Sequence, residues 1–396
     1  MQVSNHIKRL LLMNLSATII FNYIGIFVNL YVWEKSKSIF DVTWLNLILF
    51  ISWSIAFATG SRLLSRFSTR FLIRGTAIAG ALTFLLLMFL ELDNKVLWLT
   101  LLGLPIGVMW GFYASAQNIT LTIYGRGKDF EGYFSVASII GQVVSILNPI
   151  AFALVIKWLG YSGSFLLMFL FVTALLTVSF FIPEISLSRE PEPLFHHMRF
   201  RQVFTSKALR YMVPSCLAAG IFLQFQGLFA LIFTFSVSSD KLVISLLNVM
   251  YACSSITAMI IYRRVQAKEG LWLTIGMAAI CIGFLIPLFP KAPLLVVSNI
   301  LTTVGMFYFG TVWNTRQFRI ICRHTVMEQA RILLWREWFL NLSRITMLVL
   351  ILFVKELRGP TFIALIGLAI VSAMLIPYFS AKSTEAMEEA MAQENG

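Results

Sequence analysis

The chain has 396 residues, of which 59% are hydrophobic and only 12% are charged. Its mean hydropathy of +0.84 excludes a water-soluble fold of this size, because such a fold would need far more polar surface. Most of the 31 lysines and arginines precede the first apolar segment or lie in alternate loops. This positive-inside pattern predicts that both termini are cytoplasmic, and it explains the net charge of +13 without a nucleic-acid partner.

Twelve apolar segments are each long enough to cross the ~30 Å of a bilayer's hydrocarbon as a helix. They lack the alternation over about ten residues that marks the strands of a membrane β-barrel. We expect helices at 10–33, 43–61, 72–91, 96–119, 132–157, 161–183, 209–235, 242–262, 271–290, 293–315, 331–354 and 360–380. The first is too long for a signal-peptide core and is expected to be a retained span. The predicted class is an all-α multi-pass protein of the cell membrane, plasma or inner.

The two halves of the chain resemble each other. At an offset of 202 residues Gly25 aligns with Gly227, Asn46 with Asn248 and Arg62 with Arg264. Two six-helix copies related by pseudo-twofold symmetry are the simplest explanation. Such an internal repeat is typical of transporters whose halves rock around a site between them.

A long polar interval separates these halves. We expect an N-terminal six-helix bundle over 1–183, a cytoplasmic linker over 184–208, a C-terminal six-helix bundle over 209–380 and a cytoplasmic tail over 381–396. Prolines at the start of the linker favour an extended chain. Its basic remainder is expected to form a short amphipathic helix on the inner membrane surface.

The turn after the second span carries regularly spaced arginines. It runs from Gly60 to Arg70 and resembles the G-x-x-x-D-R-x-G-R-R signature of the major facilitator superfamily, with Ser65 in place of the aspartate and one extra residue. Together with the 6+6 spans and the basic central loop, the resemblance extends over nearly the whole chain. In that family the turn's acid and basic residues latch the outward-facing state, and without the aspartate the latch here must differ. The basic residues concerned are Arg62, Arg66 and Arg70 and, in the twin turn, Arg263 and Arg264. The alternative is that these arginines only contact lipid phosphates and set the topology.

Uncharged polar residues recur in several spans. Helices 1, 4, 7 and 10 line the cavity in the major facilitator superfamily, so the resemblance implies that polar residues there contact the substrate. The candidates, with one from the fifth span, are Asn22, Asn29, Tyr113, Gln117, Gln142, Gln224, Trp313 and Asn314. For any single amide, a hydrogen bond between helices is the alternative role.

Span 331–354 carries charges at depth. A charge at mid-bilayer costs about 2.5–3.5 kcal/mol on insertion scales, so each one is a candidate functional residue. Glu337, Asn341 and Arg344 are spaced i, i+4 and i+7, which places them on one helix face. We hypothesise that Arg344 and Asn341 bind an anionic group of the substrate and that Glu337, beside Arg336, gates the site or carries a proton. The alternative is structural: neighbouring helices hold Arg344, and Glu337 pairs with an adjacent arginine.

These patterns predict a secondary transporter of the major facilitator type, moving a small organic, anionic or amphiphilic solute by alternating access. Two rivals remain open, a lipid or lipid-linked flippase on the same fold and a non-transporting sensor or assembly protein. No metal-ligand spacing or catalytic motif is present, so we expect no enzyme activity, no cofactor and no metal. The expected partners are a small-molecule substrate and membrane lipid, and the expected state is a monomer.

Overall fold

The computed structural model describes residues 5–64, 66–89, 93–124, 128–182, 184, 198–265, 267–289, 291–357 and 359–394. Across these ranges the chain is helical, and no strand occurs in them. Most of the predicted linker, 185–197, lies outside the described residues, as does Ser65 of the turn after the second span. Of the amphipathic helix expected there, the structure describes a single helical turn, α7 (Phe200–Val203).

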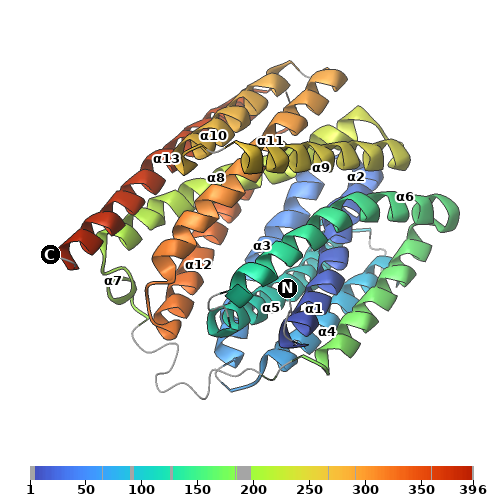
Figure 1. Cartoon of the computed structure of the whole chain (residues 1–396). Helices are drawn as coiled ribbons and strands as arrows, with labels where there is room; N and C mark the ends of the chain where they lie inside the picture. Colours follow the sequence, from blue (N-terminus) through green and yellow to red (C-terminus); the bar gives the residue numbers. More distant parts are fainter. Residues whose placement is uncertain are drawn as a thin grey trace. The chain divides into compact units, whose positions relative to one another are not determined.

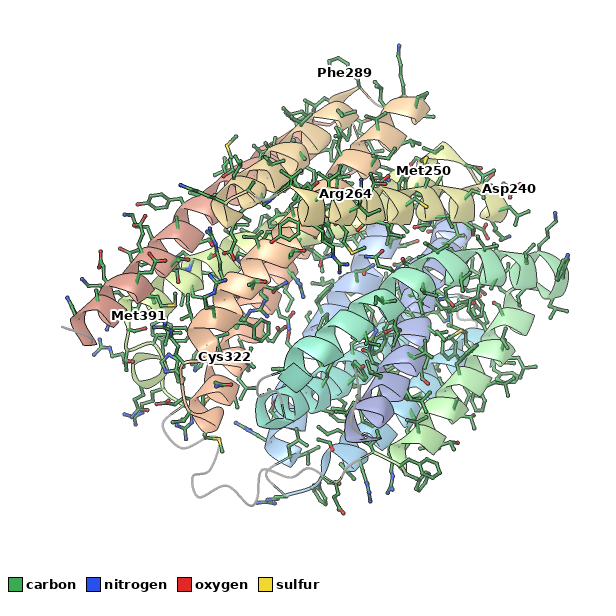
Figure 2. All side chains as sticks on the ribbon, viewed as in Figure 1. Asp240, Met250, Arg264, Phe289, Cys322 and Met391 are labelled. Carbon is green, nitrogen blue, oxygen red and sulfur yellow. The ribbon has the colours of Figure 1, made fainter. Side chains whose placement is uncertain are left out.

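The chain divides into two compact units. Unit 1 comprises Met1–His196 with Asp240–Val249, and unit 2 comprises His197–Ser239 with Met250–Gly396. The division falls inside one helix, α9 (Lys241–Arg264); Figure 2 labels Asp240, just before it, and Met250 and Arg264 within it. The first half of α9 is therefore described with unit 1 and its second half with unit 2.

Unit 1 is built from the helices of the first half of the chain. They are α1 (Asn5–Tyr23), a π-helical segment (Ile24–Val28), α2 (Asn29–Ser36), α3 (Ile39–Leu63), α4 (Thr69–Phe89), α5 (Lys95–Tyr124) and α6 (Lys128–Ser179). Figure 1 shows them in blue to green. Aromatic side chains fill the core around Tyr23, which is fully buried and whose hydroxyl lies 2.6 Å from Ser164 Oγ.

Glycines allow a close approach of two helices in unit 1, α3 and α5. Gly103, Gly107 and Gly111 recur at every fourth position of α5, and a methyl group added at Gly111 would lie 2.6 Å from Ala56 Cβ of α3. Small residues at this spacing let two backbones approach closely, which is how membrane helices gain packing energy where burial from water contributes little.

Unit 2 contains the remaining helices. They are α7, α8 (Lys207–Val237), α10 (Glu269–Leu285) with a 3₁₀ turn (Ile286–Leu288), α11 (Ala292–Ile321), α12 (Val326–Ile351) and α13 (Pro360–Glu394). In Figure 1, α13 (red) runs beside α8 and α10. A phenylalanine cluster joins α8, α10 and α13 through Phe225, Phe284 and Phe362.

The predicted membrane spans correspond to these helices. In the described residues ten helical stretches are long and apolar enough to cross a membrane. One of them, Ile139–Ser179, contains Gly160 at φ 70°, a left-handed conformation that suits glycine, and the predicted spans 132–157 and 161–183 meet there. The helix predicted at 331–354 is α12, which is not among the ten because it carries too many charges.

The predicted tail continues the last helix. α13 extends from Pro360 to Glu394 without interruption. Ser383, 4% exposed, donates from Oγ to the Ala208 carbonyl of α8 at 2.7 Å. The first part of the tail is thus packed against unit 2.

Candidate functional site

The charged helix α12 is anchored firmly at its start. Thr325 caps it by accepting from the Glu328 amide, and the Thr325 amide in turn donates to Glu328 Oε2 at 2.9 Å. This reciprocal capping satisfies amide groups that the helix itself leaves unpaired. α12 also packs closely on α8. Gly220 of α8 makes this possible, because a Cβ at that position would lie only 2.5 Å from the Leu340 carbonyl oxygen of α12. The register of α12 within unit 2 is therefore well defined.

Arg336 lies at the centre of a buried polar cluster in unit 2. Its side chain donates to Gln317 Oε1 at 2.6 Å, to Asn314 Oδ1 at 2.8 Å and to Glu337 Oε1 at 2.9 Å. The guanidinium also lies 5.0 Å from the centre of the Trp313 ring. Arg336 and Glu337 are nearly buried, with side-chain exposures of 9% and 13%. A buried charge of this kind is tolerated only when it is paired and hydrogen-bonded, as it is here.

A second layer of contacts supports these partners. Trp313 donates from Nε1 to Ser215 Oγ at 2.8 Å, and Gln317 Nε2 lies 3.4 Å from Cys216 Sγ. Ser215 and Cys216 belong to α8, so the Arg336 cluster joins α8, α11 and α12. Sequence reasoning missed Ser215 as a member. Its only signal was a hydroxyl next to a buried cysteine on a helix expected to line the cavity.

The predicted face of α12 is present but its members have different surroundings. Asn341 is 2% exposed, and Arg344, half-buried, has its Nη1 atom 3.5 Å from Asn341 Oδ1. Glu337 pairs with its neighbour Arg336, which is the contact that the structural alternative expects. Two roles stay predictions: that Arg344 binds the substrate, and that Glu337 gates the site or carries a proton.

The asparagines of the first span bond to three different helices of unit 1. Asn14 accepts from Tyr113 of α5 at 3.0 Å and from Gln117 of α5 at 3.4 Å. Asn22 accepts from Asn148 of α6 at 2.8 Å. Asn29 accepts from Asn46 of α3 at 2.9 Å. These amides therefore form hydrogen bonds between helices, the alternative role that the sequence left open.

The remaining polar candidates do not join one cluster. Gln224 is buried in α8, and Gln142 is half-buried in α6, where its carbonyl accepts from Ser145. Asn22 and Asn29 are separated by the π-helical segment Ile24–Val28. A π-helical insertion changes the helical phase, and such segments are frequent at functional sites.

The two basic turns make different contacts. Arg62 and Arg66 are exposed, whereas Arg70 donates to the Ile182 carbonyl at 2.8 Å and lies 3.8 Å from Glu184. In unit 2, Arg263 and Arg264 are exposed at the end of α9.

The acid of the second turn, Glu269, bonds to α11. Its carboxylate accepts from Arg319 at 2.9 Å and lies 3.6 Å from Arg316 Nε. Sequence reasoning did not identify these partners.

Comparison with known proteins places this geometry in a known fold. No family model matches the chain. A curated relative, the uncharacterized protein YqgE of Bacillus subtilis (strain 168), is 24% identical over 374 residues, which cover 89% of this chain and 84% of the relative.

Solved structures of transporters match almost the whole chain. A POT family transporter in complex with 5-aminolevulinic acid superposes with a TM-score of 0.74 at 11% identity, covering 96% of each chain. A bacterial homologue of the iron transporter ferroportin in its inward-facing state gives 0.69 at 10% identity over 97% of this chain and 100% of that chain. The nucleoside transporter NupG superposes with a TM-score of 0.64 at 14% identity, covering 96% of this chain and 99% of that chain. The prediction of fold class is confirmed: this chain has the fold of the major facilitator transporters.

Proposed function

We propose that this protein is a secondary transporter that carries a small organic solute across the cell membrane by alternating access between its two bundles. The observation that carries the proposal is a fold shared along nearly the full chain with solved transporters. The polar cluster around Arg336 adds support, because a charged cluster inside a span is costly and is usually retained for function. The positive-inside pattern supports an orientation with both termini cytoplasmic.

The charges of α12 favour an anionic solute. Beyond its first turn this helix carries Arg331, Arg336 and Arg344 against one acid, Glu337. Arg331 and Arg336 are buried, at 6% and 8% exposure. The excess of positive charge in one span attracts an anionic group more strongly than a cationic one.

Arg336 and Arg344 of α12 have different surroundings, and we assign them different roles. Three hydrogen bonds and the Trp313 ring hold Arg336 within unit 2, so Arg336 organises the cluster. Arg344 lies about two turns further along the helix, half-buried and beside Asn341. We assign substrate recognition to Arg344 with Asn341, and gating or proton coupling to Glu337 with Arg336.

Purified protein in lipid nanodiscs provides the test. A thermal-shift screen against anionic metabolites, amphiphilic compounds and lipid precursors identifies stabilising solutes. Each one is then measured for counterflow into proteoliposomes. The expected result is saturable flux of an anionic solute, lost in Arg344→Gln but retained in Arg323→Gln, a matched change at an exposed arginine.

Three outcomes contradict the proposal in different ways. Absence of flux for every stabilising solute would remove the transporter assignment. Scrambling of a fluorescent phospholipid without solute flux would favour the flippase. Flux that is unchanged in Arg344→Gln would leave transport in place and remove the assigned role of Arg344.

A further inference from the structure

A cavity of about 400 Å³ opens at the end of unit 1 where α2 turns into α3. Lys37, at φ 51°, ends α2, and Ser38 caps α3 by accepting from the Asp41 amide. The lining residues come from α2, α3, α5 and the turn before α5: Val32, Lys35, Ser36, Asp41, Asp93, Lys95, Trp98 and Leu99. This volume lies within the range of sites that take small molecules, about 300–1,000 Å³. The cavity lies wholly in unit 1 and contains none of the residues assigned above.

Asp41 is the unusual member of this lining. It is only 9% exposed, yet among the described residues none forms a hydrogen bond or an ion pair with its carboxylate. The N-terminus of α3 favours a negative charge there, but it leaves the carboxylate oxygens facing the cavity without a donor. A carboxylate that lines a cavity and accepts from no protein donor is available to a cationic group of a ligand.

The other walls add complementary chemistry. Val32, Trp98 and Leu99 are buried and provide an apolar floor, at 2%, 7% and 1% exposure. Lys35 and Lys95 are exposed at the rim, with Lys35 Nζ 5.5 Å from the centre of the Trp98 ring. The cavity therefore combines a nearly buried carboxylate and an apolar floor with two exposed ammonium groups and the exposed carboxylate of Asp93.

We propose that this cavity binds a small zwitterion with an ammonium group, an apolar body and a carboxylate, as in an α-amino acid. The ammonium group pairs with Asp41, the apolar body packs on Trp98, and the carboxylate faces Lys35 and Lys95. The lining carries two acids and two lysines, so a ligand without net charge can pair at both ends. In the proposed orientation the cavity faces outward, and it forms a second binding site that is separate from the α12 cluster.

Three matched probes test the proposal on the full-length protein in nanodiscs. L-leucine carries both charges, 3-methylbutylamine only the cation, and 4-methylpentanoate only the anion, on the same apolar skeleton. Affinities come from titration calorimetry or saturation-transfer NMR. We expect leucine to bind most tightly, because it alone can use both ends of the cavity.

Two substitutions separate the two ends. Asp41→Asn keeps the shape and removes the charge, so the affinity for leucine and for 3-methylbutylamine should fall roughly tenfold or more, with 4-methylpentanoate unaffected. Lys95→Met should lower the affinity for leucine and for 4-methylpentanoate but leave the affinity for 3-methylbutylamine unchanged. Glu184→Gln, at an exposed carboxylate, is the control and should change nothing.

The outcomes are decisive and independent of transport. Melting curves without probe establish that each variant folds, and Lys95→Met carries the test if Asp41→Asn does not fold. The proposal is overturned if wild-type protein binds none of the probes, if leucine binds no better than the amine, or if a folded Asp41→Asn binds leucine as tightly as wild type. Arg344→Gln should bind leucine normally, so a failure of the transport assignment and a failure of this site are distinguishable.

Discussion

Arg336 of α12 donates from Nε to Gln317 Oε1 of α11 at 2.6 Å. Its neighbour Glu337 takes a second hydrogen bond from the same guanidinium, and Asn314 takes a third. Because the fork of the guanidinium is planar and rigid, three partners fix its position far better than one charge pair would. This cluster ties α12 to α11.

Removal of Arg336 should therefore destabilise the protein more than a typical surface change. In Arg336→Met the carboxylate of Glu337, 13% exposed, remains without its cation, and breaking such a buried pair costs about 3–5 kcal/mol. We expect a clear drop in melting temperature, measured by tryptophan fluorescence in detergent. The double variant Arg336→Met/Glu337→Gln should recover part of the loss, since the uncompensated charge is gone. An equal loss in the exposed control Arg323→Met would argue against this explanation.

The hydrogen bond between Asn148 of α6 and Asn22 of α1 allows a test of whether Asn22 has a structural role or binds substrate. Asn148 donates to Asn22 at 2.8 Å and is 6% exposed. In a double-mutant cycle of Asn22→Leu and Asn148→Leu we expect a coupling of about 0.6 kcal/mol, the average for hydrogen bonds between membrane helices. If Asn22 instead serves the substrate, Asn22→Leu will abolish flux while the cycle shows no coupling.

The sequence predicted the helices better than the contacts. Hydropathy is a property of segments about 20 residues long, so spans such as 43–61 could be identified as helices with no tertiary information. Their partners could not be predicted in this way. Asn22 faces Asn148, which lies more than a hundred residues away, and only the packing of α1 against α6 brings the two amides together.

The candidate site shows the same difference. Helical spacing alone groups Glu337, Asn341 and Arg344 on one face, because that grouping is set within α12. The partners of Arg336 come from α11, and Ser215 comes from α8, so the sequence offered no local signal that they meet. Asp41 precedes the predicted span 43–61, and only its burial beside a cavity distinguishes it.

The glycines of α5 should be intolerant of side chains at the contact with α3. A Cβ at Gly111 would lie 2.6 Å from Ala56 Cβ and 2.7 Å from the Trp53 carbonyl oxygen, so Gly111→Ala forces the two helices apart at a cost of about 1–3 kcal/mol. Gly141 of α6 is the matched control, because nothing lies within 4 Å of its would-be Cβ. Gly141→Ala should be neutral or slightly stabilising, since alanine favours helices. Comparable melting temperatures for the two variants would contradict this α3–α5 packing.

The ion pair between Glu269 and Arg319 should respond to salt, unlike the pair within the Arg336 cluster. Arg319 donates to Glu269 at 2.9 Å, but the two side chains are 46% and 39% exposed, so solvent screens the pair and Glu269→Gln should cost less than about 1 kcal/mol. The Debye length falls from about 10 Å at 0.1 M salt to about 3 Å at 1 M, and the difference in melting temperature between Glu269→Gln and wild type should shrink accordingly. The effect of Arg336→Met should persist at 1 M, because Arg336 and Glu337 are shielded from the ions that would screen them. A Glu269→Gln effect of the same size at both salt concentrations would show that this pair, despite its exposure, is closed to solvent when the protein is in its membrane.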